Sequence, residues 1–248
     1  MRFLVLQHLD IEHPGIFRKF FRERGIAWDA IELDRSEAIP DMSEYDALAV
    51  FGGPMDVWDE DQHPWLVAEK AAIRKWVHEL KRPFLGVCLG HQLLVASLDG
   101  TVSKMLVPEV GIVYISLTQA GRNDPLMAGV PILSRVLQWH GAEVSRLPSG
   151  AVVLAKNDAC AIQALRVGKH AYGLQYHVEI EPETVSVWKN VPEYAAALTQ
   201  LLGPAGRTLL ERSARKEMPQ LNAVASTLCD NFQRIVAGAL VPSAAAAI

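Results

Sequence analysis

The stretch PFLGVCLGHQLLVASLDG, residues 83–100, decides the fold, because a buried strand passes there directly into a helix. The short apolar run FLGVC, residues 84–88, predicts the strand. LGHQLLVASLDG, residues 89–100, predicts a helix that ends at Gly100. An amphipathic helix over residues 65–82, with Pro83 just past its end, precedes the strand. The order helix, strand, helix is typical of an α/β unit.

The same alternation runs through the N-terminal part of the chain. Three apolar segments predict strands: RFLVLQ (2–7), IAWDAIEL (26–33) and EYDALAVFGGP (44–54). The segment HPGIFRKFFRERG (13–25) has apolar residues at helical spacing and stops at a glycine. This repetition predicts an α/β fold, with a parallel sheet covered by helices on both faces.

Beyond Thr101 the pattern changes. Strands separated by turns are predicted for GIVYISLT (111–118), SRVLQWHG (134–141), AVVLAKN (151–157), AIQALRV (161–167) and AYGLQYHVE (171–179). From Glu181 the chain becomes helical, over residues 182–203 and 206–240, and we expect residues 241–248 to fray. No repeat or flexible linker divides it, so we predict one domain over 1–248: a core of about 1–180 and a helical C-terminal tail, 181–248.

Composition narrows the class of protein. The 248 residues are 50% hydrophobic and 21% charged, with a net charge of −4, as in a globular protein. Lys and Arg form no long block, so we expect no nucleic-acid partner. No apolar run approaches the roughly 18 residues of a membrane span, and the apolar run at the N-terminus is too short for a signal peptide.

The three cysteines, Cys88, Cys160 and Cys229, are widely spaced and form no C-x-x-C pair. That spacing fits neither a disulfide framework nor a zinc knuckle. We therefore predict a cytoplasmic protein with free thiols.

Cys88 lies between two glycines in Gly86-Val-Cys-Leu-Gly90, the cysteine version of the G-x-S-x-G nucleophile elbow. A tight strand-to-helix turn requires small neighbours two positions away on each side. The start of a helix favours the thiolate, and the N–H of Leu89 is free to stabilise an oxyanion. The alternative is a small buried apolar side chain, which we favour for Cys160 and Cys229.

A nucleophilic thiol needs a base, and the segment GLQYHVE supplies a candidate. His177 and Glu179 are two residues apart at the end of a predicted strand, so both side chains leave on one face and Glu179 can orient the imidazole. A solvent-facing histidine beside an ordinary acidic run is the alternative. A metal site is a third interpretation, but no further cluster of ligands stands nearby, so we expect no metal.

The glycine pair Gly52-Gly53 follows a predicted strand. Its backbone N–H groups can approach a ligand, and one of them can complete an oxyanion hole with Leu89. An ordinary Gly-Gly-Pro turn is the alternative.

Four segments, GGP, GVCLGHQLL, WHGAEV with LPSGAVVLA, and GLQYHVE, occur in the order and approximate spacing of the class I glutamine amidotransferase family. Over residues 1–180 the chain resembles the stand-alone branch, related to the glutaminase part of GMP synthase. The resemblance implies a flavodoxin-like open α/β sheet, mixed and mostly parallel, a Cys-His-Glu triad and release of ammonia from glutamine. We expect no cofactor.

The resemblance also implies roles at matching positions. Cys88 would attack the γ-amide carbon, His177 would move the proton and Glu179 would orient His177. The N–H groups of Gly53 and Leu89 would form the oxyanion hole. The substrate would lie against the remaining matched positions, which are Gly52, Gln92, Val110, Gly111, His140, Gly141 and Glu143.

Two departures from the family pattern bear on the substrate. After Trp139-His140-Gly141 the family commonly has an aspartate that grips the substrate's α-amino group, whereas this chain has Ala142 followed by Glu143. Either Glu143 reaches the site from the next position, or the substrate lacks a free α-amino group there, because an unpaired ammonium in a closed pocket costs several kcal/mol.

The second departure is length. The segment 181–248 is too short for an ATP-binding synthetase, and no phosphate-binding loop occurs. Three hypotheses remain. The first is a γ-glutamyl amide hydrolase, which is either a glutamine amidotransferase with a separate synthetase subunit or a hydrolase of γ-glutamyl peptides or γ-glutamylamines. The second is a non-catalytic regulatory subunit. The third is a general cysteine hydrolase of similar fold.

Residues 58–61, WDED, are a candidate lid over the leaving group, or a solvated acidic turn.

Overall fold

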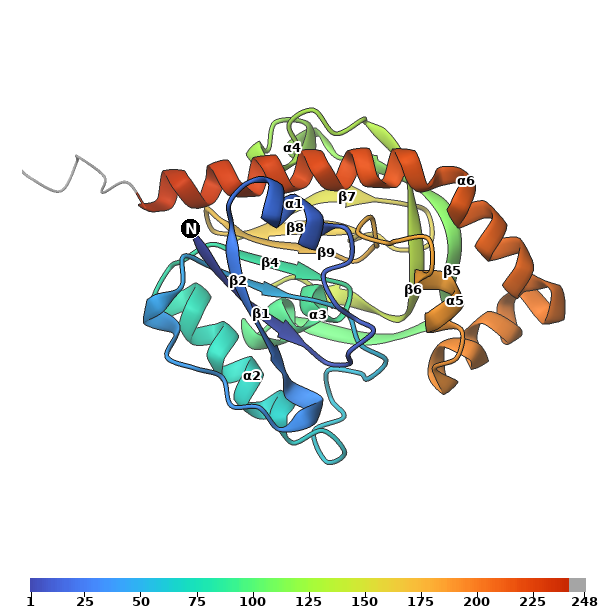
Figure 1. Ribbon diagram of the computed structural model, residues 1–248, viewed down its shortest axis with the longest axis horizontal. Coiled ribbons are helices and arrows are strands. Elements are labelled where there is room, and N and C mark those ends of the chain that lie inside the picture. The colour runs from blue at the N-terminus through green and yellow to red at the C-terminus, as the bar shows by residue number, and fades with distance from the viewer. Residues whose placement is uncertain (241–248) are drawn as a thin grey trace, which may run out of the picture.

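The computed structural model describes residues 1–240, whose nine strands form one sheet in the order β2-β1-β3-β4-β9-β8-β7-β5-β6 (Figure 1). The strands are β1 (Arg2–Gln7), β2 (Ala27–Glu32), β3 (Ala47–Val50), β4 (Phe84–Val87), β5 (Thr101–Leu117), β6 (Leu133–Arg146), β7 (Ala151–Lys156), β8 (Ala164–Val167) and β9 (Ala171–Leu174). The helices are α1 (Phe17–Glu23), α2 (Trp65–Arg74), α3 (Leu89–Ser97), α4 (Gln119–Arg122), α5 (Thr184–Trp188) and α6 (Pro192–Leu240). Short turns of 3-10 or π helix are η1 (Leu33–Arg35), η2 (Met42–Glu44), η3 (Lys75–Glu79) and η4 (Pro125–Met127). The prediction that residues 241–248 fray lies outside the described residues.

The sheet has a parallel half and an antiparallel half. Strands β2-β1-β3-β4-β9 pair in parallel, in the order that flavodoxin-like folds adopt. From β9 outward, β8, β7, β5 and β6 pair antiparallel. The prediction of a mixed α/β sheet flanked by helices, with a helical C-terminal segment, is confirmed.

Alternate residues of the strands enter two separate apolar cores. Phe3 and Val5 of β1 pack with α1 and the long helix α6, whereas Leu4 and Leu6 face α2 and α3 on the opposite side. Because the inner parallel strands β1, β3, β4 and β9 are covered on both faces, they consist almost entirely of buried residues, whereas the edge strand β2 is partly exposed. Figure 1 shows α6 running along one face of the sheet, beside α1.

Several elements differ from their predicted bounds. Strand β5 begins at Thr101 rather than at residue 111, and its pairing with β6 shifts register between Lys104 and Glu109. The strand predicted over 171–179 ends at Leu174, because its partner β4 ends there and α3 begins. The N–H of Cys88 donates to the carbonyl oxygen of Leu174 at 2.7 Å.

The tail is helical, as predicted, but with an interruption. The segment predicted as one helix over 182–203 divides into α5 and the beginning of α6. Within α6, Gly203 has φ 64° and ψ −170°, so the helical run turns there before continuing to Leu240. A positive φ of this kind is readily adopted by glycine.

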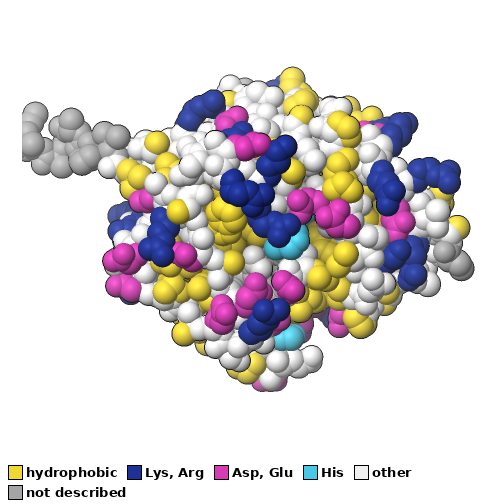
Figure 2. Space-filling model, in the orientation of Figure 1, with side chains coloured by type: hydrophobic (Ala, Val, Ile, Leu, Met, Phe, Trp, Pro, Cys, Tyr) yellow, Lys and Arg dark blue, Asp and Glu magenta, His cyan; other side chains and the backbone are white. Residues whose placement is uncertain are grey.

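On the face shown in Figure 2, side chains of both charge signs are interspersed around apolar patches. Among residues 1–240, the helices lack a segment with the length and apolar character needed to cross a membrane. The three cysteines are free thiols and are buried.

Candidate active site

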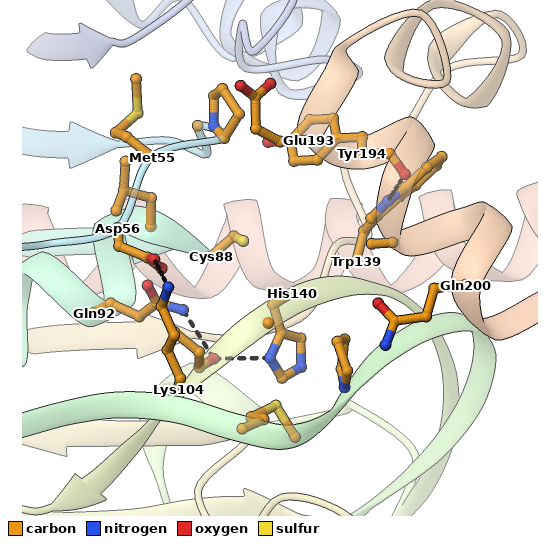
Figure 3. A pocket seen from close by; sticks show the side chains of 18 of the residues that line it. Met55, Asp56, Cys88, Gln92, Lys104, Trp139, His140, Glu193, Tyr194 and Gln200 are labelled. Atoms are coloured by element: carbon orange, nitrogen blue, oxygen red, sulfur yellow. Dashed lines mark hydrogen bonds and ion pairs between the residues drawn. The ribbon is translucent and has the colours of Figure 1, made fainter. Parts of the chain in front are cut away.

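The residues singled out by the sequence meet at one edge of the sheet. Because β1, β3, β4 and β9 are parallel and adjacent, the segments that follow their carboxyl ends are neighbours in space. Those segments carry His8, Gly52-Gly53, Cys88 and residues 175–179. Open α/β sheets bind ligands at this edge, where the strand order reverses. A cavity of about 410 Å³ lies there, with Cys88 on its wall (Figure 3).

Cys88 occupies a strained turn between β4 and α3. Its φ of 53° and ψ of −106° lie in a region that residues with a side chain rarely adopt. The thiol lies directly before the first helical residue, at the positive end of the helix dipole. Its side chain points into the cavity in Figure 3, and the residue is only 5% exposed.

The two flanking glycines are required by contact with backbone atoms. A Cβ on Gly86 would lie 2.3 Å from the carbonyl oxygen of Gly90, and a Cβ on Gly90 would lie 2.1 Å from the carbonyl oxygen of Val50. The first residue of the helix can therefore pack against β4 and β3 only if both positions lack a side chain. This is the steric basis of the elbow.

His177 and Glu179 form a buried pair beside Cys88. His177 Nδ1 lies 2.6 Å from Glu179 Oε1, and the N–H of Val178 donates to Glu179 Oε2 at 2.9 Å. The backbone of His177 pairs with Leu137 of β6 in an isolated bridge, and its ring stands edge-on to Trp188 at 4.7 Å. The imidazole is thus fixed by a carboxylate, a strand and an aromatic ring, although the regular strand β9 ends three residues earlier.

The electrostatics of the pair favour an imidazolium. Burial alone would lower the pKa of His177, but the charge of Glu179 and the contact with the Cys88 thiol raise it well above its usual value. Across residues 1–240, three or more side chains of the types His, Cys, Asp and Glu do not converge in a metal-binding arrangement.

Five of the predicted oxyanion-hole and substrate-binding residues line the cavity with Cys88: Gly53, Leu89, Gln92, His140 and Gly141. The side chains of Gln92 and His140 both donate to the carbonyl of Ala142, at 3.1 Å and 2.9 Å (Figure 3). Gln92 also donates to Gln175 Oε1 at 3.2 Å. The other ring nitrogen of His140 lies 3.2 Å from a carboxylate oxygen of Glu109, so hydrogen bonds and this close contact together support the wall.

The structure does not bring the other predicted residues to the cavity wall. Val110 and Gly111 lie on β5 past the register shift, paired with Trp139 and Gln138, while the wall takes residues 104–106 and 108 from this strand. Gly52 lies behind the wall, where its Cα faces Glu12 and His177.

Glu143 does not reach the cavity, so the prediction that it contacts the substrate is corrected. Residues 139–142 of β6 line the cavity, whereas Glu143 does not. Its carboxylate contacts the thiol of Cys160, where burial, with the charges of Glu143 and Glu109, raises the pKa of Cys160 to about 12. Glu143 therefore does not replace the aspartate that is missing at position 142.

Two other carboxylates line the cavity, Asp56 and Glu193. Asp56 lies 3.8 Å from Lys104 Nζ, whereas Glu193 belongs to the exposed first turn of α6. Trp58, the first residue of the proposed lid, is 40% exposed and does not line the cavity, but its ring lies 6.0 Å from Lys104 Nζ.

The tail supplies residues that the sequence did not indicate. Tyr194, Ala197 and Gln200 of α6 line the cavity along with Glu193. In Figure 3, Tyr194 and Gln200 lie across the cavity from Met55 and Asp56. Tyr194 packs against Trp139 and Trp188, with ring centroids 5.6 Å and 5.8 Å apart. No motif marks this segment, since its role depends only on where α6 begins.

Glu12 is a third carboxylate of the site that the sequence did not reveal. It is 2% exposed, and a Cβ on Gly52 would lie 2.5 Å from its Oε2. Burial raises the pKa of Glu12 to about 7, while the charge of His177 and a hydrogen bond with Tyr194 act in the opposite direction. Glu12 therefore titrates near neutral pH directly beside the His177–Glu179 pair.

This titration predicts a pH-dependent effect of Glu12→Gln on stability. The pKa is 4.5 for an ordinary glutamate and about 7 in the fold, so the protonated form is stabilised by folding and that stability is lost as the pH rises through 7. Relative to E12Q, the wild-type free energy of unfolding should fall by about 3 kcal/mol between pH 4 and pH 8. Urea unfolding at both pH values measures it.

The control for this experiment is Glu193→Gln, an exposed carboxylate on the same cavity, which should change stability by less than about 0.5 kcal/mol at either pH. An E12Q protein whose difference from wild type is the same at both pH values contradicts the raised pKa.

Comparison with known proteins shows which protein family has a similar sequence. The sequence profile described as glutamine amidotransferase class-I matches residues 16–187. The glutamine amidotransferase-like protein YfeJ of Salmonella typhimurium is 33% identical over 191 residues, covering 75% of this chain and 78% of that protein. A glutamine-hydrolyzing GMP synthase subunit of Sulfolobus acidocaldarius is 28% identical over 165 residues, covering 65% of this chain and 83% of that protein.

A further relative is gamma-glutamyl peptidase 3 of Arabidopsis thaliana, 28% identical over 178 residues that cover 68% of this chain and 69% of that protein. Among solved structures, a glutamine amidotransferase from Thermotoga maritima superposes with a TM-score of 0.83 and 27% identity, over 95% of this chain and 98% of that chain. The similarity to this structure thus includes the helical tail.

Proposed function

The chain belongs to the class-I glutamine amidotransferase family, and from that premise we propose that it hydrolyses the γ-amide bond of glutamine or of a γ-glutamyl amide through a thioester on Cys88. One observation carries the proposal: the Cys88 thiol, held at the head of α3, faces a cavity beside the buried His177–Glu179 pair. A nucleophile, a base and a group that orients the base are the parts that this chemistry needs.

In the first half of the reaction the Cys88 thiolate attacks the γ-carbonyl carbon. The carbonyl oxygen becomes an oxyanion, which the N–H groups of Gly53 and Leu89 stabilise from the cavity wall. The C–N bond then breaks, and the departing ammonia or amine takes the proton of the His177 imidazolium. The products are a γ-glutamyl thioester on Cys88 and the free amine.

In the second half a water molecule attacks the thioester. His177, now neutral, accepts a proton from the water, and the C–S bond breaks to release glutamate and restore the thiolate with its imidazolium. In both halves Glu179 holds Nδ1 of His177 and stabilises the positive charge on the ring.

A second candidate, a hydrolase of substituted γ-glutamyl amides such as γ-glutamyl peptides or γ-glutamylamines, is favoured by the shape of the site. No carboxylate stands at Ala142 to hold a free α-amino group, and Glu143 does not line the cavity. The cavity of about 410 Å³ also extends from Cys88 to α6, within the size range of sites that take ligands larger than an amino acid.

Release of ammonia and glutamate from glutamine, γ-glutamyl-alkylamides and γ-glutamyl peptides distinguishes the candidates. If glutamine is preferred, we propose that a separate synthetase subunit receives the ammonia. If substituted amides are preferred, the protein is a hydrolase without an acceptor. Mass spectrometry after acid quenching should find one γ-glutamyl group on the peptide that contains Cys88, and turnover without that adduct would contradict the thioester.

Glu179→Gln is expected to lower kcat/KM by about 10²- to 10⁴-fold, because glutamine cannot stabilise the imidazolium as a carboxylate does. Since Glu179 raises the pKa of His177, its loss lowers that pKa, so the high-pH limb of the rate profile should move to lower pH. A pH profile of kcat/KM from pH 5 to 10 measures both effects.

The matched control is Glu181→Gln, two residues further along, where the carboxylate pairs with Arg18 instead of a site residue. Its activity should stay within about threefold of wild type. Equal losses in E179Q and E181Q would show that the His177–Glu179 pair has no special role.

A further inference from the structure

A second buried histidine–carboxylate pair lies behind the wall of the cavity. His8, directly after β1, and Glu69, on α2, are both fully buried. His8 Nε2 lies 3.0 Å and 3.2 Å from the two carboxylate oxygens of Glu69, and the His8 ring stacks on Trp65 at 5.3 Å and 19°. Neither residue lines the cavity, so the proposed chemistry does not use the pair directly.

The other ring nitrogen of His8 reaches the glycine pair. His8 Nδ1 lies 2.7 Å from the carbonyl oxygen of Gly52, and since a carbonyl oxygen only accepts hydrogen bonds, Nδ1 carries the proton. Burial alone would lower the pKa of His8, but the charge and hydrogen bond of Glu69, with the bond to Gly52, raise it above its usual value. A raised pKa favours the charged ring, and a charged donor forms a stronger hydrogen bond than a neutral one.

The hydrogen bond to Gly52 determines the direction of the next N–H group. The carbonyl of Gly52 and the N–H of Gly53 belong to one peptide plane, and residues 1–240 contain no cis peptide. In a trans peptide these two groups point in opposite directions. An oxygen directed at His8 therefore directs the Gly53 N–H away from His8. Gly53 lines the same cavity as Cys88 and Leu89, so an N–H directed away from His8 can reach a ligand bound there.

The glycine pair needs such an anchor. Within the described part of the chain the N–H groups of Gly53 and Leu89 donate to no protein acceptor, so the bond from His8 to the Gly52 carbonyl is what holds the Gly52–Gly53 peptide. Glycine populates more backbone conformations than other residues, and a rotation of this peptide would turn its N–H out of the site. Hydrogen bonding to the carbonyl also polarises the peptide and strengthens its N–H as a donor.

We propose that the buried His8–Glu69 pair is a positioning device for the oxyanion hole, which acts through the Gly52–Gly53 peptide and fixes the Gly53 N–H toward the γ-carbonyl oxygen. The inference rests on the proposed hydrolysis, because it assigns the oxyanion to the site beside Cys88. His8 and Glu69 are positioning residues and touch no reacting atom.

The test compares two double variants. H8L/E69M removes the pair and leaves no buried charge, which avoids the penalty of an unpaired carboxylate. H8N/E69Q keeps an amide N–H near the position of Nδ1. We expect H8L/E69M to lower kcat about 10²-fold with KM within about threefold, as for the loss of one oxyanion donor, and H8N/E69Q to recover at least tenfold of that loss.

Thermal unfolding and far-UV circular dichroism confirm that both variants are folded. A rise in KM at constant kcat, or equal losses in the two variants, would mean that the pair only supports the fold. A second measurement does not depend on turnover: the amide resonance of Gly53 in ¹H–¹⁵N spectra should shift more in H8L/E69M than in H8N/E69Q.

The ¹H–¹⁵N spectrum tests the positioning role of the His8–Glu69 pair separately from the proposed amide hydrolysis. If wild type hydrolyses none of the amides but the Gly53 resonance shifts as stated, the proposed function fails and the positioning of the peptide stands. If the Gly53 resonance is the same in wild type and H8L/E69M, the positioning is overturned whether or not the protein is an amide hydrolase.

Discussion

Replacing Cys88 with alanine should lower kcat/KM for γ-glutamyl amides by about 10⁴-fold or more, because the thioester cannot form without the thiol. The fold should persist, since Ala keeps the backbone conformation and removes only one sulfur atom from a 5% exposed position. Steady-state rates measured by glutamate release, with circular dichroism as a check of folding, give the result.

The chain offers two matched controls, Cys160→Ala and Cys229→Ala. Both thiols are buried and free, neither lines the cavity, and burial raises the pKa of each to about 12, so both are inert. Both variants should retain activity within about twofold. If C88A turns over amides at the wild-type rate, then the thiol in the elbow is structural and the proposed function is wrong.

The second large effect is expected at Gly90, where alanine should lower the free energy of unfolding by about 3 kcal/mol or more. The new Cβ would lie 2.1 Å from the backbone carbonyl oxygen of Val50 in the central strand β3, an atom that cannot rotate away. Relief requires α3 to move off the sheet, which displaces Cys88 as well. Urea unfolding measures the change, and kcat/KM should fall in the same protein.

Gly238→Ala is the control for this substitution. Gly238 lies in α6 with nothing within 4 Å of the position of a Cβ, so alanine should raise the free energy of unfolding by up to about 1 kcal/mol through helix propensity. Similar unfolding curves for G90A and G238A would contradict the steric account of the elbow.

The elbow was predictable because its requirements are local. An apolar run, a cysteine between two glycines and a helical pattern occupy 18 consecutive residues, 83–100, and each requirement acts between neighbours in the chain. The same holds for the spacing of His177 and Glu179, whose pairing at 2.6 Å needs only two residues of extended chain. The N-terminal strands and the helical tail were predicted for the same reason.

The errors arose where partners distant in sequence decide the outcome. The strand containing His177 was predicted to continue to Glu179, but β9 loses its partner where β4 ends, and His177 pairs instead with Leu137 of β6. Val110 was assigned to the pocket, yet the register shift after Lys104 presents other residues of β5 to the cavity.

The sequence by itself determined the alternation of strands and helices, the nucleophile elbow and the histidine–carboxylate spacing, because hydrophobic period and steric exclusion act over a few residues. Only the tertiary structure decided what surrounds Cys88. Glu12, Tyr194 and the His8–Glu69 pair come from loops and helices whose positions depend on strand order and on the packing of α6. Their neighbours are set by long-range packing of buried side chains, which no local pattern encodes.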